Sequence, residues 1–484
     1  MLQRIREGLT LVLIAVLPLH ALLVTVGTKL IAGPGNSPLP MLAIWKEALL
    51  AVILLIAMVE LAMQSNGHRT MSKVDAVDLC IGGLLLIALV QYFVFHLPSS
   101  TSHFVYGFKY DFIPLAGFVL LRRVPWSEAF RLQVAGCIVL IGGIVVVYGI
   151  ATTLFPMSWF TALGYSDLHS LYVSGGPLAP FQQIEASGLR RIQSTLSGPN
   201  QLGLWLLIPL SISLIRLQKT FRTPAQWRDL GYLAFLGLVL LKTFSRSAWI
   251  AAAVIGAVLA WKYLPKKKFL IATCSMLILG VIAIFAFPNV IVRVASSTGH
   301  IERPLQALRI MQEHPLGLGL GTAGPASNRF SDTCVDLPVG ADASWAQAHP
   351  QLCVFVGGSQ VQPIDHACSC PLLPENWYLQ IGVELGWIGF VLYTLLIAFI
   401  LRRLFLQFAI CNQDSIANCK LQKTCALALL GISIAALFLH AWEDSAVAYT
   451  VWILLAALLI PQQSQLWCFR GRRKVLQADA AMLP

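Results

Sequence analysis

The chain has 484 residues, of which 57% are hydrophobic and only 12% are charged, about half the charged share of an ordinary soluble domain. This composition excludes a water-soluble multidomain enzyme and indicates a protein with many transmembrane helices. The net charge of +12 would also suit nucleic-acid binding, but in a membrane protein basic residues first reflect topology.

Long apolar runs predict twelve transmembrane helices of about 20 residues each, some slightly shorter. We place them at residues 9–31, 41–63, 77–97, 104–121, 132–155, 200–217, 230–244, 247–264, 269–287, 377–401, 424–440 and 446–461. The predicted fold class is therefore an all-α polytopic membrane protein. The first run is long for the apolar part of a secretory signal peptide, so we expect it to remain as a span.

The predicted spans divide the chain into six parts. Spans one to five occupy residues 1–155, a first outer loop 156–199, spans six to nine 200–288, a large outer loop 289–374, spans ten to twelve 375–463, and a cytoplasmic tail 464–484. Most Lys and Arg residues lie in segments that are inside if both termini are cytoplasmic. Topology and contact with anionic membrane lipids therefore explain the positive charge, and no nucleic-acid partner is expected.

Both long loops then lie on the extracytoplasmic side, which ATP does not reach. The glycines Gly317, Gly319 and Gly321 lack the Lys-Ser/Thr pair that would follow them in a nucleotide-binding P-loop. The sequence therefore predicts a function on the outer face without a nucleotide.

The large outer loop holds four of the eleven cysteines, Cys334, Cys353, Cys368 and Cys370. In an oxidising compartment they predict up to two disulfide bonds, with three possible pairings. A metal site is the alternative, since His366 offers a nitrogen ligand beside two of these cysteines. We favour disulfides and expect no metal, because catalytic zinc ligands usually lie on firm elements rather than in a Pro/Gly-rich loop.

Charged residues at outward span ends are candidates for function, because ionised groups at membrane depth are costly. Arg190 and Arg191 lead into the sixth span, which begins at Asn200, and Ser245 and Arg246 form the turn between spans seven and eight. A guanidinium group stays protonated and donates paired hydrogen bonds to phosphate oxygens, so Arg246 predicts a phosphate ligand. An interfacial anchor is the alternative for Arg190 and Arg191, and Ser245 lacks a histidine partner at fixed spacing.

A short amphipathic helix is predicted from Arg303 to Glu313, with Arg309 between them and Pro315 stopping it. His314 and the three glycines follow this helix. Glycine allows close approach of the backbone to a ligand, which makes Gly319 a candidate binding position. The alternative is an interfacial helix with a flexible end.

The tenth span begins with a polar motif. Its candidate residues are Glu375, Asn376, Tyr378, Gln380 and Glu384. Glu375 could simply complement the helix dipole, but Glu384 lies about 13.5 Å further along the helix, where an ion must face protein or a water-filled cavity. His440, Glu443 and Asp444 form a polar turn at the outer end of span eleven.

The segments around Arg191, Arg246, His314 and Asn376 together resemble the O-antigen ligase and O-antigen polymerase family of bacterial inner-membrane glycosyltransferases. The resemblance covers most of the chain in topology and residues 191–389 in motif. The matching pieces are Arg191 with Pro199-Asn200, Phe244-Ser245-Arg246-Ser247-Ala248, His314-Pro315 with the glycines up to Gly321, and Asn376 with Leu379-Gln380, Glu384-Leu385-Gly386 and Gly389.

The resemblance implies about twelve helices arranged as in the GT-C glycosyltransferases, with a site on the periplasmic face under the large loop. It implies a glycan donor on undecaprenyl-type pyrophosphate, no cofactor or metal, and transfer with inversion to an acceptor hydroxyl. Arg191 and Arg246 would bind the pyrophosphate and stabilise its developing charge. The other expected substrate-binding residues are Arg190, Asn200, Arg303, Arg309, Gly319, Asn376, Tyr378, Gln380 and Glu384.

One position departs from the family pattern. Ligases commonly carry a histidine just before the motif asparagine, and here that position is Glu375. A carboxylate can act as a general base if burial raises its pKa, so Glu375 is the predicted base, with His314 or His366 as substitutes. The acceptor stays open among the lipid A-core, a protein and a growing glycan.

Two other classes of function remain open. A solute transporter is suggested by charged residues within the predicted spans, such as Lys109, Asp111 and Glu384. A structural scaffold of the cell envelope would require none of the outward arginines.

Overall fold

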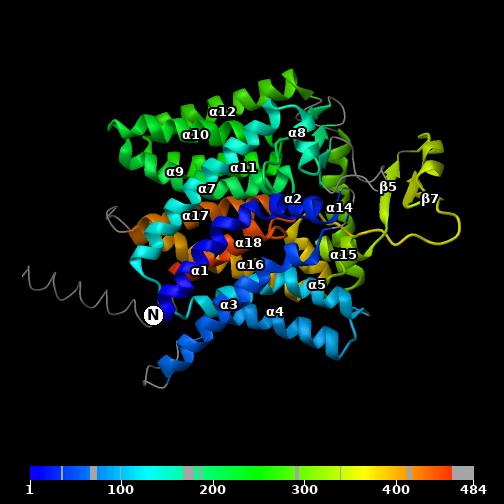
Figure 1. The fold of residues 1–484 in the computed structure, drawn as a ribbon, viewed down its shortest axis with the longest axis horizontal. Coiled ribbons are helices and arrows are strands. Elements are labelled where there is room, and N and C mark those ends of the chain that lie inside the picture. Colours follow the sequence, from blue (N-terminus) through cyan, green and yellow to red (C-terminus); the bar gives the residue numbers. More distant parts are fainter. Residues whose placement is uncertain are drawn as a thin grey trace, which may run out of the picture.

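The computed structural model describes residues 1–33, 36, 38–65, 74–98, 100–166, 179–184, 188–288, 294–337, 339–410 and 417–459. The predicted tail at 464–484 and the middle of the first outer loop lie outside the described residues. Figure 1 shows an elongated bundle of roughly parallel helices, with the N-terminus at one end and β5 (Thr333–Leu337) and β7 (Ser359–Gln362) at the other.

Helices form at each of the twelve predicted apolar runs. In chain order they are α1 (Leu2–Val16) with η1 (Leu17–Leu19) and α2 (His20–Ala32), α3 (Pro40–Ser65), α4 (Ala76–Phe93), α5 (Thr101–Asp111) with α6 (Ile113–Leu121), α7 (Glu128–Leu154), α9 (Pro199–Thr220), α10 (Ala225–Lys242), α11 (Arg246–Tyr263), α12 (Lys266–Ala286), α16 (Trp377–Ile410), α17 (Ala417–Ala435) and α18 (Ser445–Leu458).

Among the described residues, seven helices are long and apolar enough to cross a membrane, or eight if the bent pair α5 and α6 is one span. The length and composition of the helices thus support fewer membrane spans than the twelve that we predicted from the sequence. α10 contains Arg228, Asp229 and Lys242, which lower its apolar character. The 14 residues of α18 extend over about 21 Å, less than the roughly 30 Å core of a bilayer.

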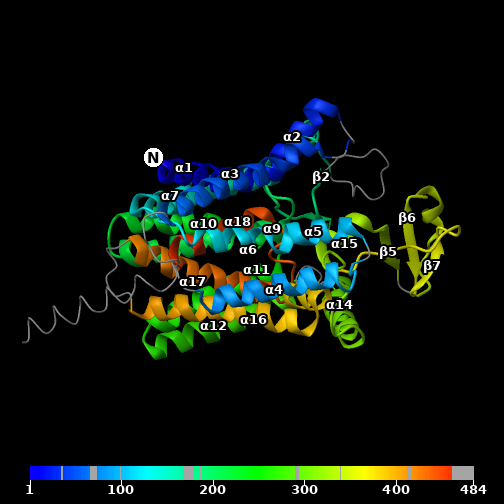
Figure 2. The same cartoon turned by 90° about the horizontal axis from the view of Figure 1, so that it is seen from below.

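The core lies around α18. Every residue of α18 from Ala446 to Leu458 is buried, as expected for a helix that is apolar on all faces. In contrast, none of the apolar window of α12 is buried inside the protein, and Figures 1 and 2 show α12 at the edge of the bundle. A peripheral apolar helix of this kind is suited to contact with lipid.

The large outer loop begins with α14 (Val294–Glu313) and α15 (Gly324–Phe330) and continues into a small sheet. In this sheet β5 pairs in parallel with β6 (Leu352–Val356), and β6 pairs antiparallel with β7. Between β5 and β6 lies the short helix η3 (Ser344–Ala348). The buried apolar cluster beneath it contains only Ala346, Leu352 and Val354 as fully buried members.

Two disulfide bonds compensate for this small core. They join Cys334 to Cys370 and Cys353 to Cys368, one of the three pairings that the sequence allowed. Small domains without a large apolar core commonly depend on such bonds.

The first outer loop contains the short helix α8 (Met157–Ala162) and two pairs of short strands. β1 (Tyr165–Ser166) pairs in parallel with β2 (Ala179–Pro180), and β3 (Gln183–Ile184) pairs antiparallel with β4 (Leu189–Arg190). The second pair brings Arg190 and Arg191 to the outer end of the bundle, just ahead of α9.

Candidate functional site

Glu375 lies immediately before α16 and is the centre of a charged cluster. Its carboxylate pairs with Arg303 and lies 2.5 Å from Nδ1 of His300, and both of these partners are on α14. Arg246, the first residue of α11, is close enough for its charge to act on Glu375. Glu375 has φ +50°, a left-handed conformation that residues other than glycine seldom adopt, so its surroundings hold it in place.

The charges around Glu375 determine its protonation. Burial alone would raise the pKa of the Glu375 carboxyl group. The hydrogen bond and charge of His300, with the charge of Arg303, outweigh burial and hold the pKa below its ordinary value. Glu375 is therefore an ionised, paired carboxylate, which is a weak general base.

His440, in the turn between α17 and α18, contacts the same residue from the other side. Its Nε2 accepts a hydrogen bond from the backbone N–H of Glu375 at 3.3 Å, and its Nδ1 lies 2.7 Å from Oε1 of Gln380. Burial lowers the pKa of His440 to about 4. A neutral ring with its proton on Nδ1 satisfies both contacts and fixes the position of Glu375.

These residues border a polar cavity of about 220 Å³. Its polar wall consists of Asn200, Gln201, His300, Glu375, His440 and Glu443. They come from α9, α14, the start of α16 and the α17–α18 turn, segments that are far apart in the sequence. Polar groups converging on a cavity in an otherwise apolar bundle are typical of a ligand site.

Arg191 supports this cavity from behind. Its side chain is only 8% exposed, and it donates hydrogen bonds to the carbonyl oxygen of Thr243 at 2.8 Å, to Oδ1 of Asn200 at 2.9 Å and to Oε1 of Gln182 at 3.2 Å. The bond to Thr243 fixes the turn that presents Arg246, and the bond to Asn200 fixes the start of α9. These contacts make Arg191 a positioning residue in this structure.

Three other predicted residues lie apart from the cluster. Arg190 donates to the carbonyl oxygen of Thr152 at 3.1 Å and stacks over Phe181, on the side of the first outer loop. Arg309 and His314 are exposed, at and just beyond the last turns of α14. His314 follows Arg303 by eleven residues, roughly 16 Å along the helix, so the structure does not bring it to Glu375.

The remaining residues of the α16 motif make contacts within the protein. Asn376 accepts a hydrogen bond from the N–H of Leu379, as a helix cap does, and donates to the carbonyl oxygen of Leu437. Tyr378 donates from its hydroxyl group to the carbonyl oxygen of Ser433 at 3.1 Å. The motif therefore fixes the start of α16 against α17, and through Gln380 it orients His440.

The glycine stretch after α14 packs against protein backbone. A Cβ atom on Gly319, at φ +93°, would lie 2.3 Å from the backbone nitrogen of Pro98. Gly321 and Ala323 donate their N–H groups to Glu384, whose side chain is completely buried. These glycines thus allow close contact with other parts of the protein backbone rather than with a ligand. Glu384 holds the stretch in place.

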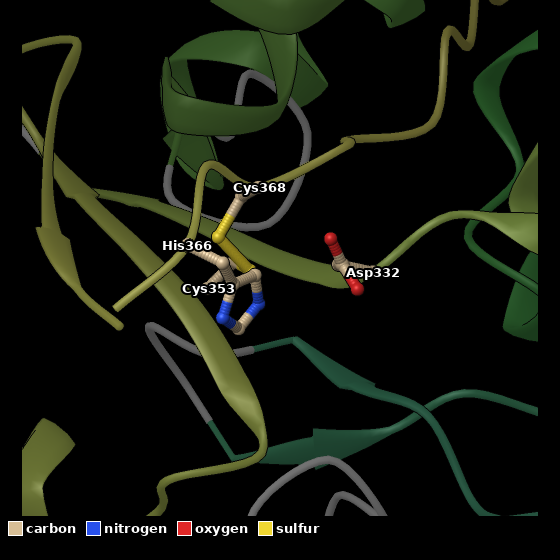
Figure 3. A group of neighbouring side chains, drawn as sticks. All are labelled: Asp332, Cys353, His366 and Cys368. Carbon is tan, nitrogen blue, oxygen red and sulfur yellow. A yellow bond between two sulfur atoms is a disulfide. The ribbon is translucent and has the colours of Figure 1, made fainter. Parts of the chain in front are cut away.

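One group of side chains in the outer loop has the spacing of a metal site. Possible ligand atoms of Asp332, Cys353, His366 and Cys368 lie within 4.8 Å of one another. Figure 3 shows that the two cysteines are joined by a disulfide bond, so neither sulfur is a thiolate. Only Asp332 and His366 remain as ligands, fewer than the three or four protein ligands of zinc sites.

The sequence motifs alone did not identify three residues of the site. His300, His440 and Glu443 belong to no matching motif, and His440 and Glu443 were read as part of a polar turn. The available signal was the concentration of ionisable residues at that turn. No family model matches the chain, and a comparison with curated proteins finds no match either.

Proposed function

We propose that the protein is a membrane glycosyltransferase that moves a preassembled glycan from an undecaprenyl-pyrophosphate-type donor to an acceptor hydroxyl on the periplasmic face. The observation that carries this proposal is that His300 and Glu375 line one polar cavity, while Arg303 pairs with Glu375 and the charge of Arg246 acts on the same residue. In the proposed reaction these residues need neither a metal nor a cofactor.

Arg246 is the best candidate for binding the leaving group. A pyrophosphate departs with negative charge, and a guanidinium group held at a protein site of low dielectric stabilises that charge most strongly in the transition state. Arg191 supports this role through the turn at Thr243. Arg303 is a further cation beside Glu375, and His300 contacts the same carboxylate, so Glu375 holds both side chains in place before the donor arrives.

The finer topology is part of the proposal. We propose twelve spans in a GT-C-like arrangement in the bacterial inner membrane, with both termini cytoplasmic. The two disulfide bonds support a periplasmic outer loop, because such bonds persist in oxidising compartments. Figure 2 shows the strands beside α14, which carries His300 and Arg303, and this places the cavity near the same end.

The test compares lipid-linked and transferred glycans in intact cells. The strains are a deletion, the wild type, Arg246→Ala and the control Arg4→Ala, which changes an exposed arginine of α1. We expect undecaprenyl-linked glycan to accumulate in the deletion and in Arg246→Ala, and wild-type profiles in Arg4→Ala. Unchanged glycans in the deletion strain would reject the proposed function. If the glycans do change, the product that is missing from the deletion strain identifies the acceptor as lipid A-core, protein or polymer.

A solute transporter is the second candidate, and one observation favours it. The α5–α6 pair is bent by 43°, and α16 is broken at Gly386, where φ is +72°. The buried carboxyl groups of Asp111 and Glu384 meet beside these two breaks. Broken helices with buried ionisable groups are common in transporters. Normal glycans together with loss of solute uptake in the deletion strain would select this alternative.

A further inference from the structure

A second and larger cavity, of about 560 Å³, adjoins the one that Glu375 borders. The two cavities share Gln201 and Glu443 as wall residues. The volume of the larger cavity lies within the roughly 300–1,000 Å³ typical of small-molecule sites. A transferase needs space for two substrates, and the donor chemistry described above uses only the smaller cavity.

The charges in the larger cavity balance one another. Its charged wall residues are Lys46, Glu47, Lys109, Arg329, Glu443 and Asp444. Glu47 pairs with Lys109 at 2.9 Å and with Lys46 at 3.4 Å, and the charge of Asp444 also acts on Lys46, so both cations have acidic partners within the protein. A cavity with no net formal charge favours an uncharged polar ligand over a phosphate or a free carboxylate.

The uncharged part of the wall has the chemistry of a sugar site. Tyr110, Trp442 and Tyr449 contribute aromatic rings, and Gln182, Gln193 and Gln201 contribute amide groups. An aromatic face packs on the apolar C–H face of a sugar ring, while amides donate and accept hydrogen bonds at its hydroxyl edge. The combination fits a carbohydrate better than an extended peptide or a lipid chain.

Glu443 lies where the two cavities meet, and its carboxyl group is unlike that of Glu375. In the part of the chain that the structure describes, the Glu443 carboxyl group takes no part in a side-chain hydrogen bond or ion pair. Its neighbour Asp444, in contrast, caps α18 and accepts a hydrogen bond from Ser197 at 2.9 Å. Burial, together with the charge of Asp444, raises the pKa of Glu443 to about 7. A carboxyl group of this kind is suited to accept a proton near neutral pH.

We infer that the larger cavity binds the sugar that accepts the glycan, and that Glu443 removes the proton from its attacking hydroxyl group. The inference rests on the proposed function and assigns the acceptor class and the base that this function requires. The acceptor is a carbohydrate, which includes a lipid A-core and a growing polysaccharide and excludes a protein hydroxyl.

The proposed reaction forms one bond, breaks one bond and transfers one proton. The acceptor oxygen forms a bond to the anomeric carbon of the donor sugar, and the bond from that carbon to the phosphate oxygen breaks. The lipid pyrophosphate leaves with the electron pair toward Arg246, and the hydroxyl proton passes to the Glu443 carboxylate. Glu375 stays paired with Arg303 and His300 throughout and does not exchange a proton.

The first test measures transfer by the purified full chain in detergent, with an undecaprenyl-pyrophosphate-linked glycan as donor and lipid A-core as acceptor. Glu443→Gln should lower kcat at least about 100-fold, the usual contribution of a general base, and leave KM for the donor within about twofold. Glu443→Asp should recover part of the rate. The matched control Glu128→Gln, which changes an exposed residue at the start of α7, should keep the wild-type rate.

A pH profile separates a base from a residue that only maintains structure. The wild-type rate should rise through a pH near 7, and Asp444→Asn should move this midpoint to lower pH, because the charge of Asp444 helps to raise the pKa of Glu443. The titratable and charged groups around Glu443 are His300, Glu375 and His440 in the smaller cavity, and His20, Lys46, Glu47, Lys109, Tyr110, Tyr165, Arg329, Asp444 and Tyr449 in the larger one. An unchanged midpoint in Asp444→Asn would overturn the role of Glu443.

The acceptor class is tested with three acceptors, a lipid A-core, a second lipid-linked glycan and a Ser/Thr peptide. Transfer to either carbohydrate supports the inference, and transfer to the peptide alone overturns it. If Glu443→Gln keeps more than half of the wild-type rate while Arg246→Ala abolishes transfer, the inference fails and the proposed function stands. If the wild type transfers glycan to none of the three, both fail together.

Discussion

The carboxyl groups of Asp111 and Glu384 meet in the interior of the protein. Asp111 is the last residue of α5 and is 7% exposed, and Glu384 lies two residues before the break of α16 and is 0% exposed. Two carboxylates buried next to each other repel, so the pair is stable in the interior only when at least one of the two groups carries a proton. The pair therefore connects two interrupted helices through neighbouring buried carboxyl groups.

Asp111→Asn should keep this connection. The amide group of Asn donates to the Glu384 carboxylate without protonation of either group, so we expect a Tm equal to or above that of the wild type. Glu384→Ala should instead lower the free energy of unfolding by about 2–6 kcal/mol, because the buried N–H groups of Gly321 and Ala323 lose their acceptor. Thermal unfolding in detergent, followed by tryptophan fluorescence, measures both variants. Equal losses of stability would contradict this account of the pair.

Gly319→Ala should be strongly destabilising. The added Cβ would overlap the backbone at Pro98, and the φ of +93° is unfavourable for alanine. Gly237→Ala is the matched control, because Gly237 is inside α10 and a Cβ there meets nothing within 4 Å. The control should gain about 0.5–1 kcal/mol from helix propensity. Thermal unfolding of the two variants should therefore shift in opposite directions, and similar shifts would argue against packing at Gly319.

Replacing Arg191 and replacing Arg246 should have different effects on thermal stability. Arg191→Ala removes a buried donor group from Thr243, Asn200 and Gln182, so both the Tm and glycan transfer should fall. Arg246→Ala should abolish transfer with little change in Tm, as expected for a residue that binds substrate. Measuring transfer and thermal unfolding on the same preparations distinguishes the two roles. A normal Tm in Arg191→Ala would indicate that Arg191 binds substrate directly rather than positioning its neighbours.

Acidification should destabilise the protein through His440. Its pKa is about 4 in the folded protein against 6.5 in the unfolded chain, so the unfolded state binds more protons below pH 6.5. The stability that neutral His440 provides is complete above this pH and is lost as the pH falls toward 4, by up to about 3 kcal/mol. His440→Asn retains an acceptor and a donor but does not titrate. The fall in Tm between pH 7 and pH 5 should be steeper in the wild type than in this variant.

The two disulfide bonds should protect the outer loop from proteolysis. Replacing Cys334 and Cys370 by serine opens a sequence separation of 36 residues, and replacing Cys353 and Cys368 opens one of 15. On loop entropy each bond contributes about 3–4 kcal/mol, more for the longer loop. Limited chymotrypsin digestion should cleave both variants faster than the wild type, at aromatic residues of the loop such as Trp345 and Phe355. Metal analysis of the reduced wild type checks the alternative, and one bound zinc per chain would favour a metal site.

The sequence by itself determined the class of protein and the positions of its helices. Long apolar segments are unstable when they are exposed to water and must be buried or inserted into a membrane. Composition alone therefore indicates a membrane protein. Helix formation is local, because each backbone hydrogen bond joins residues four positions apart, and this is why helix forms at every predicted run. The sequence also indicated that Glu384 must face protein or a water-filled cavity, since an ion at membrane depth requires it.

Only the tertiary structure decided which residues meet. The sequence allowed three cysteine pairings, and the structure has one of them, Cys334 with Cys370 and Cys353 with Cys368, although the register of β5 against β6 places Cys334 opposite Cys353. Glu375 meets His300 and His440 because α14 and the α17–α18 turn pack at the start of α16, and no local spacing encodes this contact. The same packing pairs the carboxylate of Glu375 and leaves that of Glu443 open to both cavities. Contacts between distant segments depend on how whole helices fill space together, and local sequence patterns do not contain that information.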